Sequence, residues 1–206
     1  YKLVHHAANG RAVYSFCMCP GGTVVAATSE AGRVVTNGMS QYSRNERNAN
    51  AGIVVGIDPR DFPQDPELLA SMLGQALGHA VRLDTRDTAD GFHPLAGMVL
   101  QRQLESAAFV AGGGNYNAPA QRVGDFLAGR ASLAQGKVAP SYKPGVRWTD
   151  VSACVPDYAA AAIREALREP GLGITPGLRG RVGLPLRVLV VLLHRHPHGL
   201  NGAMVP

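Results

Sequence analysis

The sequence predicts an α+β fold, in which an antiparallel β-meander is flanked by helices. Residues 12–57 contain short runs rich in valine, alanine and threonine, separated by glycine-containing turns, which is the pattern of antiparallel strands. Residues 66–171 contain segments with apolar residues at helical spacing and with proline or glycine at their ends. With 206 residues, the chain is long enough to bury a substantial core.

The strands are expected to follow one another closely along the chain. The run AVYSFCMC leads into the turn residues PGG, and the run TVVAATSE leads into the turn AGR. The mixture of valines and small residues in TVVAATSE indicates burial on at least one face. An apolar run near the C-terminus, LRVLVVLL, predicts a further buried strand. The strands are predicted at residues 12–19, 23–30, 34–40, 51–57 and 186–193.

Helices are predicted in the second half of the chain. In residues 94–112, apolar side chains recur at every fourth position and polar ones occupy the other faces. Residues 156–171 have Asp157 as a possible N-cap, an alanine-rich interior, and Pro170 followed by glycine as a stop. The helices are predicted at residues 66–77, 94–112, 121–129 and 156–171.

Charge and composition exclude several classes of protein. The formal net charge is +5, but every acidic residue lies at or before Glu169 and four arginines lie beyond it, so residues 1–170 are close to neutral. A nucleic-acid-binding domain would carry a clustered basic face, so no nucleic-acid partner is expected. There is also no apolar run long enough to predict a transmembrane helix. Residues 171–206 form a separate segment rich in Gly, Pro, Leu and Arg.

The start of the chain and its cysteines predict a cellular setting. The opening residues YKLVHHAANGR lack the apolar core of a signal peptide and have no initiator methionine, so we expect an internal piece of a longer protein. Three cysteines, two of them one residue apart, do not form a disulfide framework. Together these features predict a cytoplasmic protein.

The motif that raises a chemical question is Cys17-Met18-Cys19, which is followed by Pro-Gly-Gly. Its spacing is tighter than the C-x(2–4)-C pairs that bind zinc, and the third thiol, Cys154, is remote, so no metal site is predicted. A thioredoxin-type pair would lie at a helix start, whereas these cysteines end a predicted strand. Two readings stay open: a buried pair leading into a turn, and a reactive thiol at a ligand face. Redox sensing by the pair would require a lowered thiol pKa.

The two glycines after Pro20 suggest contact with a ligand, and the sequence lacks the common nucleotide-binding motifs. A hairpin turn needs one such glycine, so Gly21 and Gly22 together suggest that the backbone approaches a ligand closely. The sequence contains no G-x-G-x-x-G fingerprint, no P-loop and no G-x-S-x-G elbow.

Several long stretches, taken together, carry a family resemblance: YKLVHH, VYSFCMCPGGTVVAATSE, VVTNGMSQYSRNERNANAGIVV, PLAGMVLQRQLE and APAQRVGDFL. They resemble the C-terminal part of an uncharacterised group of bacterial FAD-dependent dehydrogenases, over residues 1–170. The resemblance implies a cap or substrate domain set into a flavoprotein with two dinucleotide-binding folds. It also implies that FAD is held by an N-terminal half as the missing partner, and that the substrate is a small molecule of unknown identity.

The resemblance suggests which residues would face the flavin. Cys17 and Cys19 would be the catalytic candidates, because thiols and dipoles near a flavin tune its electronics. The other candidates for lining the cleft have ordinary alternatives: Asn37-Gly38 is typical of a turn, and Arg44 of a solvated surface. The cofactor-binding candidates are Pro20, Gly21, Gly22, Asn37, Met39, Ser40 and Arg44.

Two hypotheses complete the expectations. After Glu169 the sequence departs from the family pattern, and the loss of acidic residues suggests a shifted reading frame. A family-like tail in another frame of the DNA would support this, and its absence from all frames would refute it. The rival function is a non-catalytic β-rich module that binds a ligand or partner. An upstream frame with a dinucleotide-binding fingerprint favours the flavoprotein, and an unrelated upstream gene favours the module.

Overall fold

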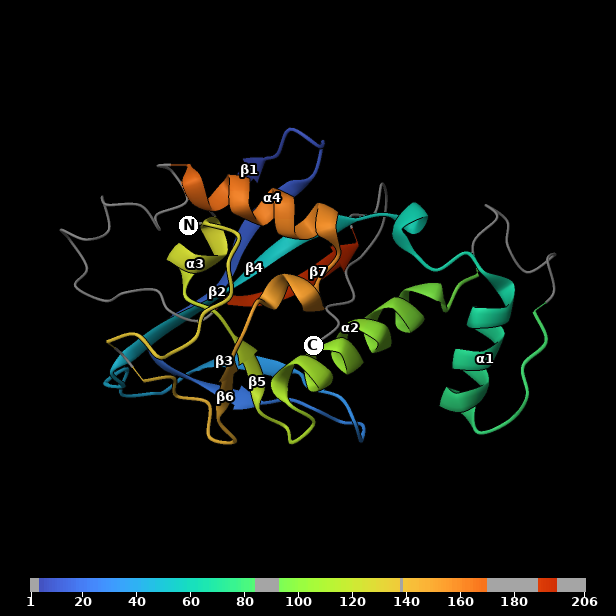
Figure 1. Cartoon of the computed structure of the whole chain (residues 1–206), viewed down its shortest axis with the longest axis horizontal. Helices are drawn as coiled ribbons and strands as arrows, with labels where there is room; N and C mark the ends of the chain where they lie inside the picture. The colour runs from blue at the N-terminus through green and yellow to red at the C-terminus, as the bar shows by residue number, and fades with distance from the viewer. Residues whose placement is uncertain (1–3, 84–92, 138, 170–188, 196–206) are drawn as a thin grey trace.

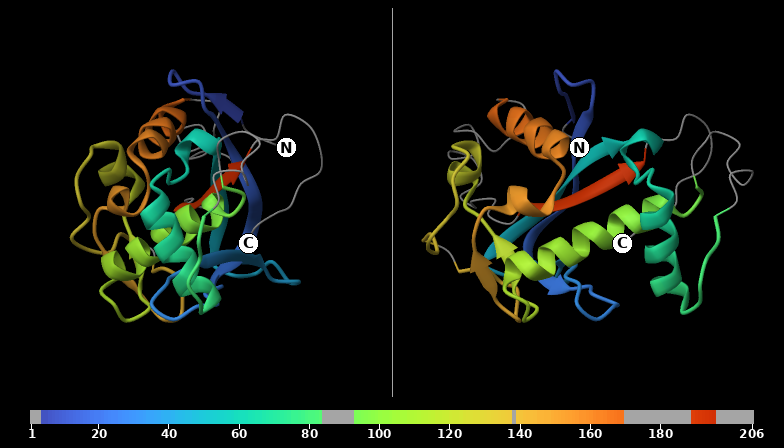
Figure 2. Two further views of the ribbon diagram at one scale, coloured as in Figure 1. Left: turned by 90° about the vertical axis from the view of Figure 1, so that its right-hand side faces the viewer. Right: turned by 45° about the vertical axis from the view of Figure 1, so that its right-hand side comes forward.

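The computed structural model describes residues 4–83, 93–137 and 139–169, together with the backbone of 189–195. It confirms the α+β class: four strands, β1 to β4, form an antiparallel sheet, and the helices α3 (Val123–Leu127) and α4 (Asp157–Arg168) cover one face of it (Figures 1 and 2). The strands of this sheet are β1 Val4–His6, β2 Ala12–Ala26, β3 Thr36–Ser40, β4 Asn48–Ile57 and β7 Leu189–Arg195.

Strand β2 organises the sheet. On one side it pairs with β4, and on the other it pairs with β1 near its start and with β3 near its end, all antiparallel. The strand that follows β3 in sequence therefore lies beside β2 instead of β3. The predicted C-terminal strand forms as β7, which runs parallel to β4 from Leu189 beside Ala51 to Arg195 beside Ile57.

The predicted turn at Pro20-Gly21-Gly22 was wrong, because β2 runs through these residues without interruption. The strand accommodates them with two irregularities. Three residues of β2 span two of β4 between Phe16 and Cys19, and the same happens between Cys19 and Gly22. Each step inserts one extra residue, which is the definition of a β-bulge and bends the strand. The chain reverses later, between Ala26 and Thr36.

The predicted helices form, with shifted ends. The helix expected over 66–77 has those bounds, and Asp65 accepts hydrogen bonds from the first free backbone N–H groups. The expected cap at Asp157 was wrong: Asp157 is the first helical residue, and Pro156 precedes it without a side-chain cap. The stop expected at Pro170 lies outside the described residues. The helices are α1 Pro66–Leu77, α2 Ala96–Gly112, α3 Val123–Leu127 and α4 Asp157–Arg168, with short 3₁₀ turns η1 Pro59–Asp61 and η3 Val151–Cys154.

Three short strands were not predicted: β1, β5 (Ala118–Ala120) and β6 (Val146–Trp148). Strands β5 and β6 form a parallel pair across 25 residues of intervening chain, in register from Ala118 beside Val146. Runs of three residues carry no periodicity, and Pro119 argues against a strand, so this pairing depends on tertiary contacts.

The main hydrophobic core lies between the sheet and α4. The small alanine faces of α4 approach the sheet closely, and Ile163 and Leu167 fill the space beside Ile53 and Val55. A second cluster joins the hairpin of β2 and β3 to the segment around Tyr142, and a third joins α1 to the start of α2. The hairpin of β2 and β3, which bears the candidate site, is packed by this small second cluster.

A buried carboxylate fixes the segment after α3. The side chain of Asp125 is 3% exposed and accepts hydrogen bonds from Arg122 Nε at 2.6 Å and Ser132 Oγ at 2.7 Å, while Arg130 Nη2 lies 2.7 Å from its other oxygen. The hydrogen bond from Arg122, followed by that from Ser132, lowers the pKa of Asp125 below its ordinary value of 3.8.

This depressed pKa gives a pH prediction. Folding favours the ionised form of Asp125, so this carboxylate stabilises the fold. The stabilisation is complete at a pH above the pKa that Asp125 has in the unfolded chain. It is lost as the pH falls through the lower pKa that Asp125 has in the folded state. The melting temperature, measured by circular dichroism from pH 6 downwards, should fall on acidification, and less steeply in Asp125→Asn. An equally steep fall in the variant would show that other carboxylates cause the acid sensitivity. Exposed Asp157→Asn serves as the control.

Candidate functional site

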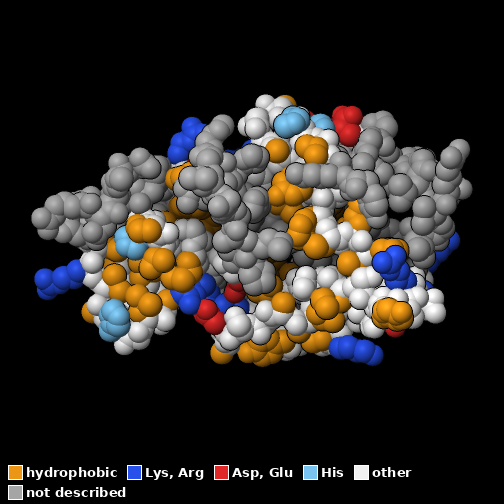
Figure 3. Space-filling view, turned by 180° about the vertical axis from the view of Figure 1, so that it is seen from behind, with side chains coloured by type: hydrophobic (Ala, Val, Ile, Leu, Met, Phe, Trp, Pro, Cys, Tyr) orange, Lys and Arg blue, Asp and Glu red, His pale blue; other side chains and the backbone are white. Residues whose placement is uncertain are grey.

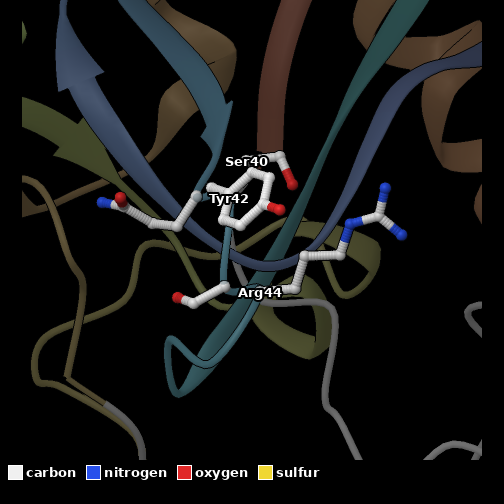
Figure 4. A pocket seen from close by; sticks show the side chains of 5 residues that line it. Ser40, Tyr42 and Arg44 are labelled. Atoms are coloured by element: carbon white, nitrogen blue, oxygen red, sulfur yellow. The ribbon is translucent and has the colours of Figure 1, made fainter.

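The structure gathers the predicted site residues at one end of the sheet. Cys17, Cys19 and the Pro-Gly-Gly segment lie in the bulged middle of β2, and Asn37, Met39 and Ser40 lie on the adjacent β3. Register brings the two strands together, with Gly22 opposite Ser40 and Thr23 opposite Met39. The loop that follows β3 carries Arg44 back over β2 (Figure 4).

The two glycines are required by the packing of the chain on itself. Gly21 has φ of 55°, and a Cβ built on it would lie 1.8 Å from the carbonyl oxygen of Arg44. A Cβ on Gly22 would lie 2.3 Å from the carbonyl oxygen of Met39. The backbone N–H of Glu46 also donates to Gly21 O at 3.3 Å. The close approach expected of a ligand is thus made by the chain's own backbone, and both glycines are buried.

A third glycine and a buried amide complete this packing. Asn50 is 2% exposed, and its Nδ2 donates to Thr23 O at 3.2 Å. A Cβ on Gly38 would lie 2.0 Å from Asn50 Oδ1, so the glycine hydrogen in that direction points at the oxygen. Asn50 Oδ1 has no conventional hydrogen-bond partner among the described residues. A weak Cα–H···O contact from Gly38 therefore replaces one.

The cysteines are more accessible than a buried pair would be. Cys17 is exposed and has φ of 46°, a left-handed conformation that non-glycine residues rarely adopt. Cys19 is partly buried, and its Sγ donates to Cys17 O at 3.3 Å. Burial, together with the nearby Cys17, raises the pKa of the Cys19 thiol. That direction is opposite to the one that redox sensing would require of Cys19.

The remaining candidates form an open surface. Asn37, Met39, Ser40 and Arg44 are all exposed, and Asn37 Nδ2 contacts Met39 Sδ at 3.7 Å. A shallow depression is lined by Ser40, Gln41, Tyr42, Ser43 and Arg44. In Figure 4 the Arg44 guanidinium extends away from the Tyr42 ring, and Tyr42 is fully exposed. Such a surface can contact a ligand on one side, but it does not enclose one.

The described residues do not fit FAD by themselves. The expected flavin position requires a cleft beside the Cys-Pro-Gly-Gly segment, and FAD also needs a glycine-rich helix start for its pyrophosphate. The space beside Gly21 and Gly22 is filled by the backbone of residues 39 and 44. The helices α1, α2 and α4 begin after Asp65, Leu95 and Pro156, without a glycine-rich loop after a strand. The described residues could contact a cofactor only through the exposed surface around Asn37, Met39, Ser40 and Arg44.

Sequence reasoning missed an ion-pair cluster beside the sheet. Arg11 donates two hydrogen bonds to the Asp61 carboxylate, from Nη2 to Oδ1 at 2.6 Å and from Nη1 to Oδ2 at 2.8 Å. Its Nη1 also donates to Gly56 O at 2.9 Å. The Arg11 guanidinium stacks over the Tyr158 ring at 3.8 Å. Burial, more than the nearby Asp61, raises the pKa of Tyr158 to about 12. The partners are separated by up to 147 positions, so no local pattern could have indicated them.

Other features of the described residues bear on metals and membranes. His5 Nε2 lies 2.9 Å from Glu165 Oε1. The hydrogen bond to His5, then that from Ala8 N, lowers the pKa of Glu165. Among the described residues, no group of three or more His, Cys, Asp or Glu side chains could hold a metal ion. Nor do the described helices include one with the length and apolar character needed to cross a membrane.

Comparisons with known proteins identify the family. A family model described as "FAD-dependent protein, C-terminal domain-like" matches residues 1–174. An uncharacterised protein of Clostridium beijerinckii is 43% identical over 168 residues, which are 81% of this chain and 26% of that protein. The chain thus spans about a quarter of the length of the curated relative it matches. The match confirms the resemblance noted in the sequence, and the chain belongs to the FAD-dependent protein, C-terminal domain-like family.

Proposed function

We propose that this chain is the C-terminal, cap-type portion of an FAD-dependent oxidoreductase, a dehydrogenase whose substrate is an unidentified small molecule. The observation that carries the proposal is the family match over residues 1–174, in a chain that spans about a quarter of its relative. FAD would be carried by another part of the intact protein, since the described residues do not fit it. When bound there, FAD would supply two-electron chemistry.

In this proposal the chain's contribution is to position and shield the substrate. The exposed side chains of Cys17, Asn37, Met39 and Arg44 would form one wall of a cleft, whose other wall belongs to the FAD-binding part. Arg44 could orient an anionic group on a substrate, because its guanidinium reaches outward (Figure 4). The packed glycines would make the wall rigid, which favours precise positioning.

Exposed apolar surface supports docking to the remainder of the intact protein. Apolar side chains gather over the end of the molecule that carries α1 (Figure 3). Leu68 and Leu77 of α1 and the neighbouring Leu95 are 38%, 50% and 40% exposed. Contiguous apolar surface of this kind is typical of protein–protein contacts.

The same observations favour a second candidate, a non-catalytic binding module. The space beside the Pro-Gly-Gly segment is closed by the chain's own backbone, and the depression at Ser40–Arg44 is open. A module of this kind would use the apolar surface for a partner and would need no flavin.

Co-expression distinguishes the two candidates. We expect this chain alone to lose any flavin on desalting. Co-expressed with the remaining portion of the Clostridium beijerinckii relative, it should form a complex that retains FAD absorbance. A chimaera in which this chain replaces the matched segment of the relative serves as the second arm, because it does not depend on association of two fragments. The isolated remainder is the control.

Either of two outcomes contradicts the proposed function. The first is flavin absorbance that stays with this chain alone. The second is a folded chimaera that binds no flavin while the intact relative does. If the chimaera folds and binds FAD only as well as the remainder alone, the chain is a module that adds nothing to cofactor binding.

A further inference from the structure

Cys17 and Cys19 occupy the part of β2 where regular strand geometry fails. A bulge separates Phe16 from Cys19, and a second one separates Cys19 from Gly22. Cys17, inside the first bulge, has φ of 46° and is exposed. Strained backbone of this kind is energetically unfavourable and concentrates at functional positions. The distortion therefore calls for a reason beyond pairing with β4.

The distortion brings the two cysteines into a relation that a regular strand does not give. In regular strands, residues i and i+2 lie about 6.6 Å apart. This is near the upper limit for the two Cα atoms of a disulfide. Here Cys19 Sγ lies 3.3 Å from Cys17 O, so the sulfur folds back over the residue that carries the other thiol. The Cys17 side chain is exposed and its thiol is free.

We propose that Cys17 and Cys19 form a thiol–disulfide exchange site, with small disulfides of the glutathione class as substrates. Cys17 attacks the disulfide, forms a mixed disulfide and releases one thiol. Cys19 then attacks the Cys17 sulfur, forms the Cys17–Cys19 disulfide and releases the second thiol. The protein loses two electrons and two protons, and the substrate gains them as two thiols.

Accessibility assigns the two roles. The exposed Cys17 meets the incoming disulfide. Cys19 is partly buried and its thiol pKa is raised, so it is the poorer nucleophile towards a free disulfide. Its position beside Cys17 O makes its attack on the Cys17 mixed disulfide intramolecular, so it resolves the intermediate. A bridge across a single intervening residue is strained and exposed, and such disulfides exchange readily instead of serving as permanent cross-links. Cys154 is 7% exposed, and burial raises its pKa to about 11, so it is an internal control.

The proposal goes beyond the proposed function and does not depend on it, because its test contains no flavin. The full chain is equilibrated with mixtures of reduced and oxidised glutathione, quenched with acid, alkylated and digested with trypsin. Both cysteines lie in one tryptic peptide, residues 12–33, between Arg11 and Arg33. We expect this peptide to lose two hydrogen atoms progressively as the share of oxidised glutathione rises. Cys154 should stay alkylatable.

Variants test the order of the two steps. Cys19→Ser should trap glutathione on Cys17, since no resolving thiol remains, whereas Cys17→Ser should react with glutathione much more slowly. Cys154→Ser should behave like the unaltered chain, and circular dichroism checks that each variant is folded. The proposal is overturned if the peptide of the unaltered chain stays reduced at every ratio, or if it accumulates glutathione adducts without the internal disulfide. Because the first arm uses the unaltered chain, a variant that fails to fold leaves the conclusion intact.

Discussion

Gly21→Ala is expected to destabilise the chain by about 2–5 kcal/mol, the largest effect of any small substitution near the candidate site. Two costs combine at this position. Gly21 has φ of 55°, and the added methyl would lie 1.8 Å from the carbonyl oxygen of Arg44. The contact is with backbone, so it can be relieved only by moving the loop after β3 or bending β2 further. Urea unfolding followed by circular dichroism measures the loss.

Gly32→Ala is the matched control for this prediction. Gly32 lies in the connection between β2 and β3 and has φ of 71°, but a Cβ there meets nothing within 4 Å. It should therefore cost only the conformational penalty of about 1–2 kcal/mol. Equal losses for the two variants would mean that the contact between Gly21 and Arg44 does not constrain the native state. The prediction also bears on the candidate site, because the same loop carries Arg44.

Asp61→Asn is expected to destabilise the fold by about 2–4 kcal/mol. The Asp61 side chain is 8% exposed and binds both terminal nitrogens of Arg11, whose side chain is 18% exposed. An amide keeps the shape but places an NH₂ group against one of these donors, leaving a poorly compensated buried cation. Asp61 also accepts from Asp58 N at 2.8 Å, so the variant loosens η1 as well.

The neighbouring exposed pair gives the comparison. Arg60 and Asp58 form an ion pair whose side chains are 84% and 39% exposed. Arg60→Ala should change the urea midpoint little, because exposed ion pairs are screened by water and salt. A loss from Asp61→Asn no greater than that from Arg60→Ala would show that the Arg11 cluster is not a stabilising element. Since Tyr158 belongs to α4, the result also reports how firmly that helix is held on the sheet.

Elements with strong local patterns could be predicted from the sequence. The α1 helix has the expected bounds because Asp65, Pro66 and Gly78 mark its ends locally. β-Branched residues also located β3 and β4 to within a few residues, whereas β2 was predicted as two strands with a turn between them. The gathering of the candidate residues at one end of the sheet followed from the pairing of neighbouring strands.

The details that decide what the candidate site can do depend on distant contacts. Pro20-Gly21-Gly22 has the composition of a turn, yet Cys19 and Gly22 pair with β4 and Gly22 also pairs with β3, so the strand continues through it. Nothing local to Gly38 indicates that it accommodates Asn50. The left-handed conformation of Cys17 likewise arises from a bulge whose register is set by β4. Sequence patterns indicate local conformational preferences, so they could not predict these three features, which arise from tertiary packing.

The parallel pairing of β7 with β4 has a consequence for any shortened form of this chain. Ala51 to Val55 of β4 are all buried, and β7 supplies the backbone partners along their outer side. A polypeptide that stopped before residue 189 would leave those N–H and C=O groups as an open, apolar sheet margin. Such margins recruit further strands from other molecules, so we expect a chain shortened in this way to self-associate along β4.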